Sequence, residues 1–212
     1  MAGLELSPAD LCIPILRRKP FTAEGWLFEL KHDGFRAFVR RSGPSIELRS
    51  RHGRSMTKAF PEVVQVLTFV PDVVLDAELV VADSAGRSDF EELRRRSLMR
   101  RLPTIEDAAA RSPGALIIFD VLLAGDVDMR PLPLAKRKEW LQANIAPRPG
   151  LHVIEGVETH GEALFSAISD QDFEGIVGKR LDSRYTAYQQ PRWVKIKNPS
   201  YSRKEALGFR GR

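Results

Sequence analysis

One lysine in this sequence stands where a nucleophile could act. Lys31 follows the apolar run Trp26 to Leu30 and precedes Asp33 and Gly34, a pair typical of tight hairpin turns. A lysine amine attacks an electrophile only when it is neutral, and nearby cations or an apolar pocket lower the pKa of such an amine. The same short pattern also occurs by chance at charged hairpin tips, so the pattern alone leaves both interpretations open.

Two carboxylates lie in or beside apolar runs that are far apart in the chain. Glu78 stands inside the run Val73 to Val81, and Glu174 directly precedes Gly175 to Val177. Asp76 lies two residues before Glu78, so both acids face one side of the expected strand. An acid buried in a strand is costly unless it is paired or binds a metal. A salt bridge in the core is the alternative for each acid taken alone.

Two paired lysines complete the set of candidate groups. The segment Trp193 to Lys197 alternates apolar residues with lysines, which places Lys195 and Lys197 on one face of a strand. An amphipathic edge strand is the alternative. Lysines can hold phosphates, and carboxylates can hold a divalent cation that neutralises the charge developing during phosphoryl transfer. With Lys31, these groups fit attack of an amine on the α-phosphate of a nucleotide, with Mg²⁺ as the cation because it prefers hard oxygen ligands.

The strands that must position these residues are short apolar runs, rich in β-branched residues and bounded by turn residues. The predicted strands span Trp26 to Leu30, Phe35 to Arg40, Ile46 to Arg49, Val73 to Val81, Ala115 to Leu123, Gly175 to Val177 and Trp193 to Ile196. The order of strands and helices lacks the regular β-α-β alternation of a parallel doubly wound sheet. We therefore predict an α+β fold with mostly antiparallel sheets.

Helices are predicted between these strands. Two of them span Pro61 to Phe69 and Leu134 to Ile145. Capping boxes indicate the starts of two others, Ser88 with Glu91 and Thr159 with Glu162, because each pair stands just before an apolar, helix-like pattern.

Length and composition narrow the class of protein. The chain has 212 residues, of which 43% are hydrophobic, so it can bury a real core, and we expect one domain. The net charge of +5 is compatible with a polyanionic partner. Cys12 stands alone, which excludes an internal disulfide and a paired-cysteine zinc site and favours a reducing, cytoplasmic location. No window approaches the ~20 apolar residues of a membrane span.

Six short motifs in order make the chain resemble the covalent nucleotidyltransferases, which include ATP-dependent DNA ligases, RNA ligases and mRNA capping enzymes. The motifs are Lys31 to Arg36, Ser50 to Gly53, Asp76 to Glu78, Phe119 to Val121, Glu174 to Lys179 and Trp193 to Lys197. The resemblance covers most of the chain and is closest to the ligase part of bacterial end-joining DNA ligases. It implies the nucleotidyltransferase fold of DNA ligases and capping enzymes, which is ATP-grasp-like and α+β.

The resemblance implies a role for the residues that would contact the nucleoside. Lys31 would carry AMP, and Glu29 would accept a hydrogen bond from the amino group of adenine. Phe119 would stack on the adenine ring, and Arg36 and Arg51 would hold ribose and phosphate.

It also implies which residues would bind the phosphates and the metal. Glu174 would bind the catalytic Mg²⁺, and Glu78 would contact either the ribose or the metal. Lys195 and Lys197 would grip the α-phosphate of ATP. ATP and Mg²⁺ are thus the expected cofactors.

The chain departs from the family pattern near its end. Ligases of this family continue after the last of these motifs into an OB domain, so we expect a nucleotidyltransferase domain over residues 1–197 and no OB domain. The remaining residues, Asn198 to Arg212, are expected to form a short, basic and mobile tail. The segment Arg184 to Arg192 lacks the Pro-Gly-Arg character expected before the last motif, which argues against a DNA contact there.

An arginine-rich stretch lies outside the motifs. Leu93 to Arg101 contains five arginines on a predicted helix, a density that could contact the phosphates of a nicked duplex. A solvated helix face is the alternative, and it is slightly favoured because Glu91 and Glu92 supply partners one turn away.

We therefore expect an ATP-dependent DNA ligase core that adenylates itself at Lys31 and passes AMP to the 5′-phosphate of nicked or broken double-stranded DNA. A separate OB-domain or end-joining protein could supply the missing functions, and no membrane partner is expected. An RNA ligase or a capping-type nucleotidyltransferase is one alternative. A nucleotide- or DNA-binding accessory module that no longer seals strands is the other.

Overall fold

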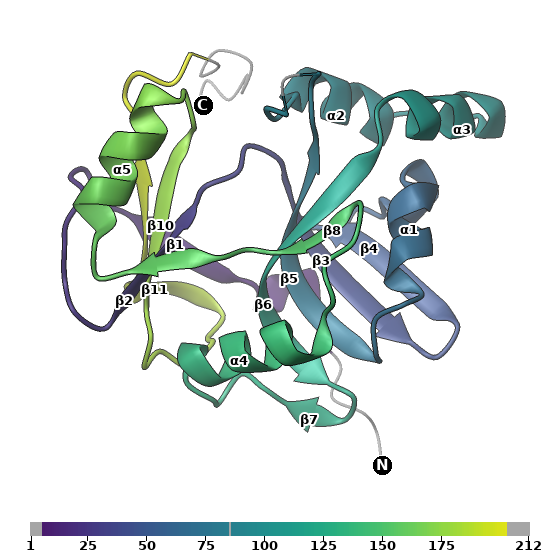
Figure 1. Ribbon diagram of the computed structural model, residues 1–212. Helices are drawn as coiled ribbons and strands as arrows, with labels where there is room; N and C mark the ends of the chain where they lie inside the picture. Colours follow the sequence, from purple (N-terminus) through teal and green to yellow (C-terminus); the bar gives the residue numbers. More distant parts are fainter. Residues whose placement is uncertain (1–5, 85, 203–212) are drawn as a thin grey trace.

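The fold is built from two mostly antiparallel sheets that face each other across the molecule. The computed structural model describes residues 6–84 and 86–202. In this part of the chain, five strands form one sheet in the order β1-β11-β10-β2-β9, and six form the other in the order β4-β3-β5-β6-β7, with β8 beside β6. Figure 1 shows α5 on one side of the molecule and α1 on the other, with the sheets between them. These observations confirm the predicted α+β class.

The five-stranded sheet contains most of the fifth and sixth of the six motifs, and one of its strands ends directly before Lys31, where the first motif begins. Its strands are β1 (Cys12–Leu16), β2 (Trp26–Leu30), β9 (Gly156–Glu158), β10 (Gly175–Arg180) and β11 (Tyr188–Lys197). Only β1 and β11 pair in parallel within it, and the other neighbours are antiparallel. The helix α5 (Gly161–Asp170) packs on β10 and β2.

The six-stranded sheet contains the acidic motif and the aromatic motif. Its strands are β3 (Phe35–Ser42), β4 (Ser45–Ser50), β5 (Val73–Val81), β6 (Gly114–Ala124), β7 (Val127–Asp128) and the added β8 (Leu151–Val153). Its helices are α1 (Pro61–Leu67), α2 (Phe90–Ser97), α3 (Leu102–Arg111) and α4 (Leu134–Asn144). Two short 3-10 turns, Pro8–Asp10 and Thr57–Ala59, complete the described elements.

The apolar core has three parts, and one of them joins the two sheets. Leu27 and Trp193 from the five-stranded sheet pack with Phe38, Val74 and Leu122 from the six-stranded sheet. A larger cluster lies between the six-stranded sheet and its helices, and a smaller one lies under α5. Because the joining cluster occupies only part of the space between the sheets, polar side chains from both sheets can meet beside it.

The predicted strands are confirmed, although β11 begins five residues earlier and β10 ends three residues later than predicted. Both predicted capping boxes are wrong. The cap of α2 is Asp89, whose side chain accepts from the backbone N–H of Glu92 at 2.9 Å, while Ser88 pairs with Ala82. The backbone N–H of Thr159 donates to Trp26, so α5 begins at Gly161 without a side-chain cap. In both cases, the residue that the local pattern favoured as the helix cap takes part instead in strand pairing just before the helix.

The sequence patterns did not predict β1, β7, β8, β9 or α3. The strands among these are short or contain a proline, and α3 lacks a side-chain cap at its start. None of the described helices has the length and apolar character needed to cross a bilayer.

Candidate active site

A cavity of about 770 Å³ lies where the two sheets meet. All nine residues selected from the sequence contribute to its wall: Glu29, Lys31, Arg36, Arg51, Glu78, Phe119, Glu174, Lys195 and Lys197. They come from segments spread over most of the chain. The structure therefore brings these residues together in one cavity, while the role of each residue stays a prediction.

Strand register explains how part of this wall is built. On the five-stranded sheet, Val177 pairs with Glu29 on one side and with Lys195 on the other. The backbone N–H of Lys31 donates to the carbonyl of Gly175 at 2.9 Å. Gly175 has φ 148°, and a Cβ there would lie 2.0 Å from the carbonyl oxygen of Ile196. A glycine is therefore required at this point beside Lys31, because any side chain would collide with the backbone of Ile196.

The amine of Lys31 is held by one of the predicted carboxylates. Its Nζ lies 2.6 Å from Oε2 of Glu174, and the Nζ of Lys197 lies 3.9 Å from the other oxygen of Glu174. The Lys31 side chain is 23% exposed, whereas that of Glu174 is only 6% exposed. Glu174 therefore fixes the position of the amine at the cavity wall while leaving it accessible to a ligand.

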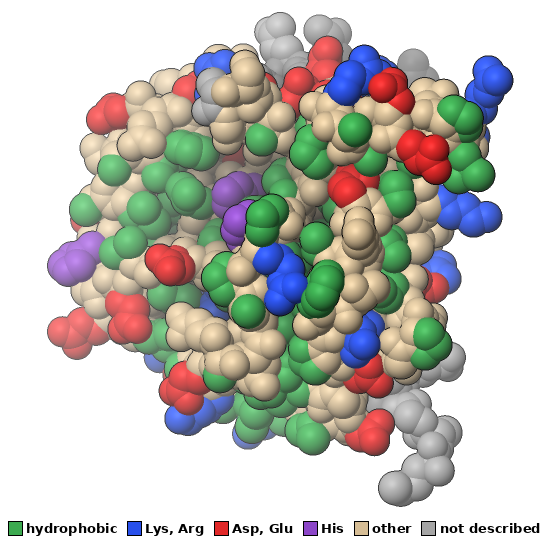
Figure 2. Space-filling view, turned by 45° about the vertical axis from the view of Figure 1, so that its right-hand side comes forward, with side chains coloured by type: hydrophobic (Ala, Val, Ile, Leu, Met, Phe, Trp, Pro, Cys, Tyr) green, Lys and Arg blue, Asp and Glu red, His purple; other side chains and the backbone are tan. Residues whose placement is uncertain are grey.

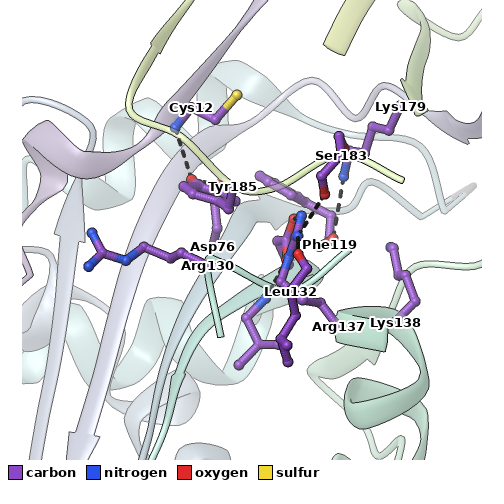
Figure 3. Close-up of polar contacts among 12 residues, drawn as sticks. Cys12, Asp76, Phe119, Arg130, Leu132, Arg137, Lys138, Lys179, Ser183 and Tyr185 are labelled. Carbon is purple, nitrogen blue, oxygen red and sulfur yellow. Dashed lines mark hydrogen bonds and ion pairs between the residues drawn. The ribbon is translucent and has the colours of Figure 1, made fainter. Parts of the chain in front are cut away.

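A buried cluster orients Arg36. Its guanidinium donates two hydrogen bonds to Asp76, at 2.9 and 2.6 Å, and the hydroxyl of Tyr185 donates to the same carboxylate at 2.6 Å. Burial alone would lower the pKa of Arg36, but Asp76 raises it above its usual value, so Arg36 stays charged. The Tyr185 hydroxyl also accepts from the backbone N–H of Cys12 at 2.9 Å (Figure 3).

Sequence analysis gave Tyr185 no role, although the segment that contains it was noted for its unusual composition. Its partner Asp76 was expected to share a face of the strand with Glu78. On β3, Asp76 pairs with Phe38 and Glu78 pairs with Arg36, without a shift of register, so the two acids do lie on one face. Tyr185 thus connects the segment before β11 to the acidic motif on β5.

Two carboxylates of the cavity wall are suited to a divalent cation. The pKa of Glu78 is raised to about 7, because burial, together with the charges of Glu174 and Asp76, outweighs the lowering effect of Lys31 and Arg36. Within residues 6–84 and 86–202, no group of three or more His, Cys, Asp or Glu side chains is arranged to hold a metal. The two carboxylates of Glu78 and Glu174 are enough for Mg²⁺, because this ion usually takes its other ligands from waters and substrate phosphates.

The cavity also holds a set of cations. Burial lowers the pKa of Lys195, and the charges of Lys197, Lys31 and Arg51 lower it further. The backbone N–H of Arg51 donates to the carbonyl of Arg36 at 3.2 Å, which joins the loop after β4 to β3. The expected cationic cluster near Lys31 is therefore present, and an anionic ligand would relieve its mutual repulsion.

Glu29 has two lysine partners, and neither was predicted. It is 2% exposed, and its carboxylate pairs with Lys138 from α4 and, at 2.6 Å, with Lys179 from β10. The Lys179 ammonium also lies 4.6 Å from the ring centre of Phe119 and 4.3 Å from that of Trp193. Lys179 belongs to the motif Glu174 to Lys179, so the sequence pattern could have indicated a role for it. Lys138 is one of several charged residues on its helix, and no pattern distinguishes it.

Comparison with known proteins assigns the chain to a family. Residues 15–197 match the family described as the ATP dependent DNA ligase domain. The chain belongs to this family. It is 30% identical over 194 residues to the SPbeta prophage-derived DNA ligase-like protein LigB of Bacillus subtilis, a match that covers 91% of this chain and 68% of that protein. It is 33% identical over 198 residues to DNA ligase C1 of Mycolicibacterium smegmatis, covering 90% and 56%.

Solved structures show the same ligase fold. The mycobacterial DNA ligase D complexed with ATP and MES superposes with a TM-score of 0.69 at 26% identity, covering 88% of this chain and 60% of that one. The Chlorella virus DNA ligase-adenylate, at 14% identity and a TM-score of 0.61, shows the fold alone. The chain thus spans only part of these relatives, from 56% to 68% of their length in the four cases named here.

The residues after β11 pack onto the ligase domain. The hydroxyl of Tyr201 donates to Asp33 at 2.9 Å, and the backbone N–H of Asn198 donates to the carbonyl of Glu174 at 2.8 Å. Asn198 and Tyr201 are both buried, so the expectation of a mobile tail is wrong for Asn198 to Ser202. This segment joins the turn after Lys31 to the start of β10. The rest of the predicted tail lies outside the described residues.

The arginine-rich stretch of the ligase domain does not form a single helix face. The helix α2 ends at Ser97, and Arg96 is fully buried with its guanidinium 2.6 Å from Glu62. Arg95 pairs with Glu92 at 2.5 Å on the surface, as the solvated-face interpretation predicted. Figure 2, in which the side carrying α1 to α3 comes forward, shows acidic and basic side chains interspersed over that face. A continuous cationic patch is therefore not seen there.

Proposed function

We propose that this chain is the catalytic core of an ATP-dependent DNA ligase, which takes AMP from ATP onto Lys31 and passes it to the 5′-phosphate of nicked DNA. The observation that carries the proposal is the pairing of an accessible lysine amine with a buried carboxylate, in a cavity that also holds Lys195, Lys197 and Arg51. Membership of the ATP-dependent DNA ligase family supports ATP as the donor.

In the first step, the neutral Nζ of Lys31 attacks the α-phosphorus of ATP. The new P–N bond forms as the bond from phosphorus to the bridging oxygen of pyrophosphate breaks, and the nitrogen releases one proton to solvent. Lys195 and Lys197 lie beside this amine and would balance the negative charge that builds up on the α-phosphate. Mg²⁺ held by Glu174 and Glu78 would supply further charge neutralisation when bound.

In the second step, an oxygen of a DNA 5′-phosphate attacks the phosphorus of the lysyl-AMP. The P–N bond breaks, Lys31 regains its amine, and a DNA-adenylate with a new pyrophosphate linkage forms. DNA as substrate is supported by the names of the relatives, DNA ligase C1 among them. A cytoplasmic location belongs to the same proposal and is supported by the single, buried thiol of Cys12.

Covalent labelling tests this function directly. The protein is incubated with Mg²⁺ and either labelled ATP or labelled GTP, and the chain is then separated by electrophoresis. ATP should label the wild type strongly, GTP weakly, and Lys31→Ala should not be labelled. No label with either nucleotide would contradict the proposal, and preferential labelling by GTP would favour a capping-type enzyme. Sealing of a nicked duplex, compared with nicked RNA, then tests the second step.

A further inference from the structure

We propose that Lys138 is a positioning residue for base selection. It holds the carboxylate of Glu29 so that this group accepts a hydrogen bond from the 6-amino group of adenine. Lys138 would thereby favour adenine over guanine nucleotides. The inference rests on one element of the proposed function, the binding of the purine next to Glu29, and does not require covalent transfer to Lys31.

The geometry places Lys138 on the side of Glu29 away from the ligand. Glu29 and Lys179 contribute to the cavity wall, whereas Lys138 is not among the described residues that do so. Lys138 is 8% exposed and pairs with Oε1 of Glu29, while Lys179 pairs with Oε2. In Figure 3, Lys138 extends from α4 toward the part of the molecule where Lys179 lies. The two lysines therefore hold the two carboxylate oxygens separately and fix the plane of the group.

This arrangement leaves the carboxylate able to bind a base. An ionised carboxylate offers about four lone-pair sites, and two ammonium partners leave sites on both oxygens unused. At position 6 of the purine, adenine presents an amino donor, whereas guanine presents a carbonyl acceptor. A carboxylate in a fixed orientation attracts the amino group of adenine and repels the carbonyl oxygen of guanine. If one oxygen lost its partner, the group could rotate, and this discrimination would weaken.

A purely structural role for Lys138 is disfavoured by its neighbour on the same helix. Arg137 is fully buried and donates two hydrogen bonds to Asp120, at 2.6 and 2.9 Å. It also donates to the carbonyls of Leu132 and Ser183, at 2.5 and 3.0 Å. Figure 3 shows Arg137 close to Leu132 and Ser183. Since Arg137 already attaches α4 to both β6 and the segment before β11, the burial of Lys138 serves Glu29 rather than the helix.

The test compares three ligands by calorimetry at equilibrium: AMP, GMP and purine riboside 5′-monophosphate, which lacks the 6-amino group. The wild type should bind AMP more tightly than both others. In Lys138→Met, the preference for AMP over purine riboside monophosphate should fall about tenfold, as expected for the loss of one oriented hydrogen bond to a charged group. Binding of purine riboside monophosphate should stay within about twofold of wild type, because it lacks the amino group.

Two further variants separate positioning from a structural effect. Lys138→Arg keeps the charge and should restore most of the preference for AMP. Lys136→Met is the matched control, because Lys136 lies on the exposed side of α4 and pairs only with Glu139 among the described residues. It should bind all three ligands like the wild type.

Several outcomes would overturn the inference. They are equal weakening of AMP and purine riboside monophosphate in Lys138→Met, an unchanged preference for AMP, or a wild type without that preference. If Lys138→Met does not fold, Lys138→Gln, which keeps polarity without charge, is judged by the same criteria. Absence of covalent labelling at Lys31 would instead contradict the proposed function and would leave this binding result unaffected.

Discussion

The cavity holds its charges in two different ways. In its closed region, Glu29 and Lys179 of the wall pair with each other, Glu29 also pairs with Lys138 behind the wall, and all three side chains are at most 10% exposed. In its open region, formed by Lys31, Glu174, Lys195 and Lys197, the Lys31 and Lys197 side chains are 23% and 52% exposed. In the closed region each lysine pairs with its own oxygen of Glu29, whereas the open region has three lysines for the two oxygens of Glu174. The closed region therefore suits a rigid binding site for the base, and the open region, with its excess of positive charge, suits the phosphates.

The largest effect is expected from removing a cation of the open region. Lys195→Ala should slow adenylation of Lys31 by about 10²–10³-fold, because a charge aimed at the developing negative charge is lost. Single-turnover labelling with ATP measures this rate. Arg192→Ala is the matched control on the same strand, since Arg192 is exposed and lies 3.5 Å from Asp182. A loss of less than about tenfold in Lys195→Ala would show that the open region does not act on the α-phosphate.

The next effect concerns stability and should distinguish the two regions. Glu29→Gln leaves two buried lysines without their carboxylate and should lower the free energy of unfolding by about 3 kcal/mol. Glu174→Gln should lower it by less than about 1 kcal/mol, because Lys31 can be solvated in the open region. Urea denaturation of both variants measures the difference. Equal losses would show that the two regions do not differ in the way their charges are held.

A smaller effect is expected at the segment that follows β11. Tyr201→Phe removes the hydrogen bond to Asp33 and should lower the maximal rate of adenylation about fivefold, as expected for about 1 kcal/mol, with the KM for ATP unchanged. Ser202→Ala, which removes a surface hydrogen bond to Asp172, is the control and should behave like the wild type. A changed KM with an unchanged rate in Tyr201→Phe would mean that Tyr201 acts on binding and not on the position of Lys31.

The smallest effect is the response to salt. Between about 0.05 M and about 0.5 M salt, the Kd for ATP should rise several-fold, because the cations of the open region are partly exposed and are screened. The Kd for adenosine should stay nearly constant, because the closed region excludes ions. Titration calorimetry with both ligands measures the two responses. A parallel rise for adenosine would contradict the assignment of the base to the closed region.

The parts of the fold that carry the motifs could be predicted from local pattern alone. The strand Val73–Val81 was predicted with its observed bounds, because a long β-branched run leaves few alternatives. The nine site residues were selected by motif type, and their convergence in one cavity follows from the order of the strands in the two sheets.

Contacts between distant segments could not be predicted in the same way. Tyr201 and Asp33 are 168 residues apart, and no periodicity indicates that a residue after β11 returns to the turn beside Lys31. Lys138 looks like any charged residue of a helix until the fold brings it to Glu29 on β2. At α2, Ser88 and Asp89 are both good capping residues, and the pairing of Ser88 with Ala82 decides between them. Tertiary packing therefore determined each feature that the sequence missed.

The most direct test of the account is the location of the adenylate. Wild-type protein is incubated with ATP and Mg²⁺, digested at neutral pH, and analysed by peptide mass spectrometry, with Lys31→Ala treated in parallel. A single AMP adduct on Lys31, absent from the variant, is the predicted result. An adduct on the adjacent His32 or on Lys195, or one that persists in Lys31→Ala, would contradict the claim that Lys31 is the nucleophile.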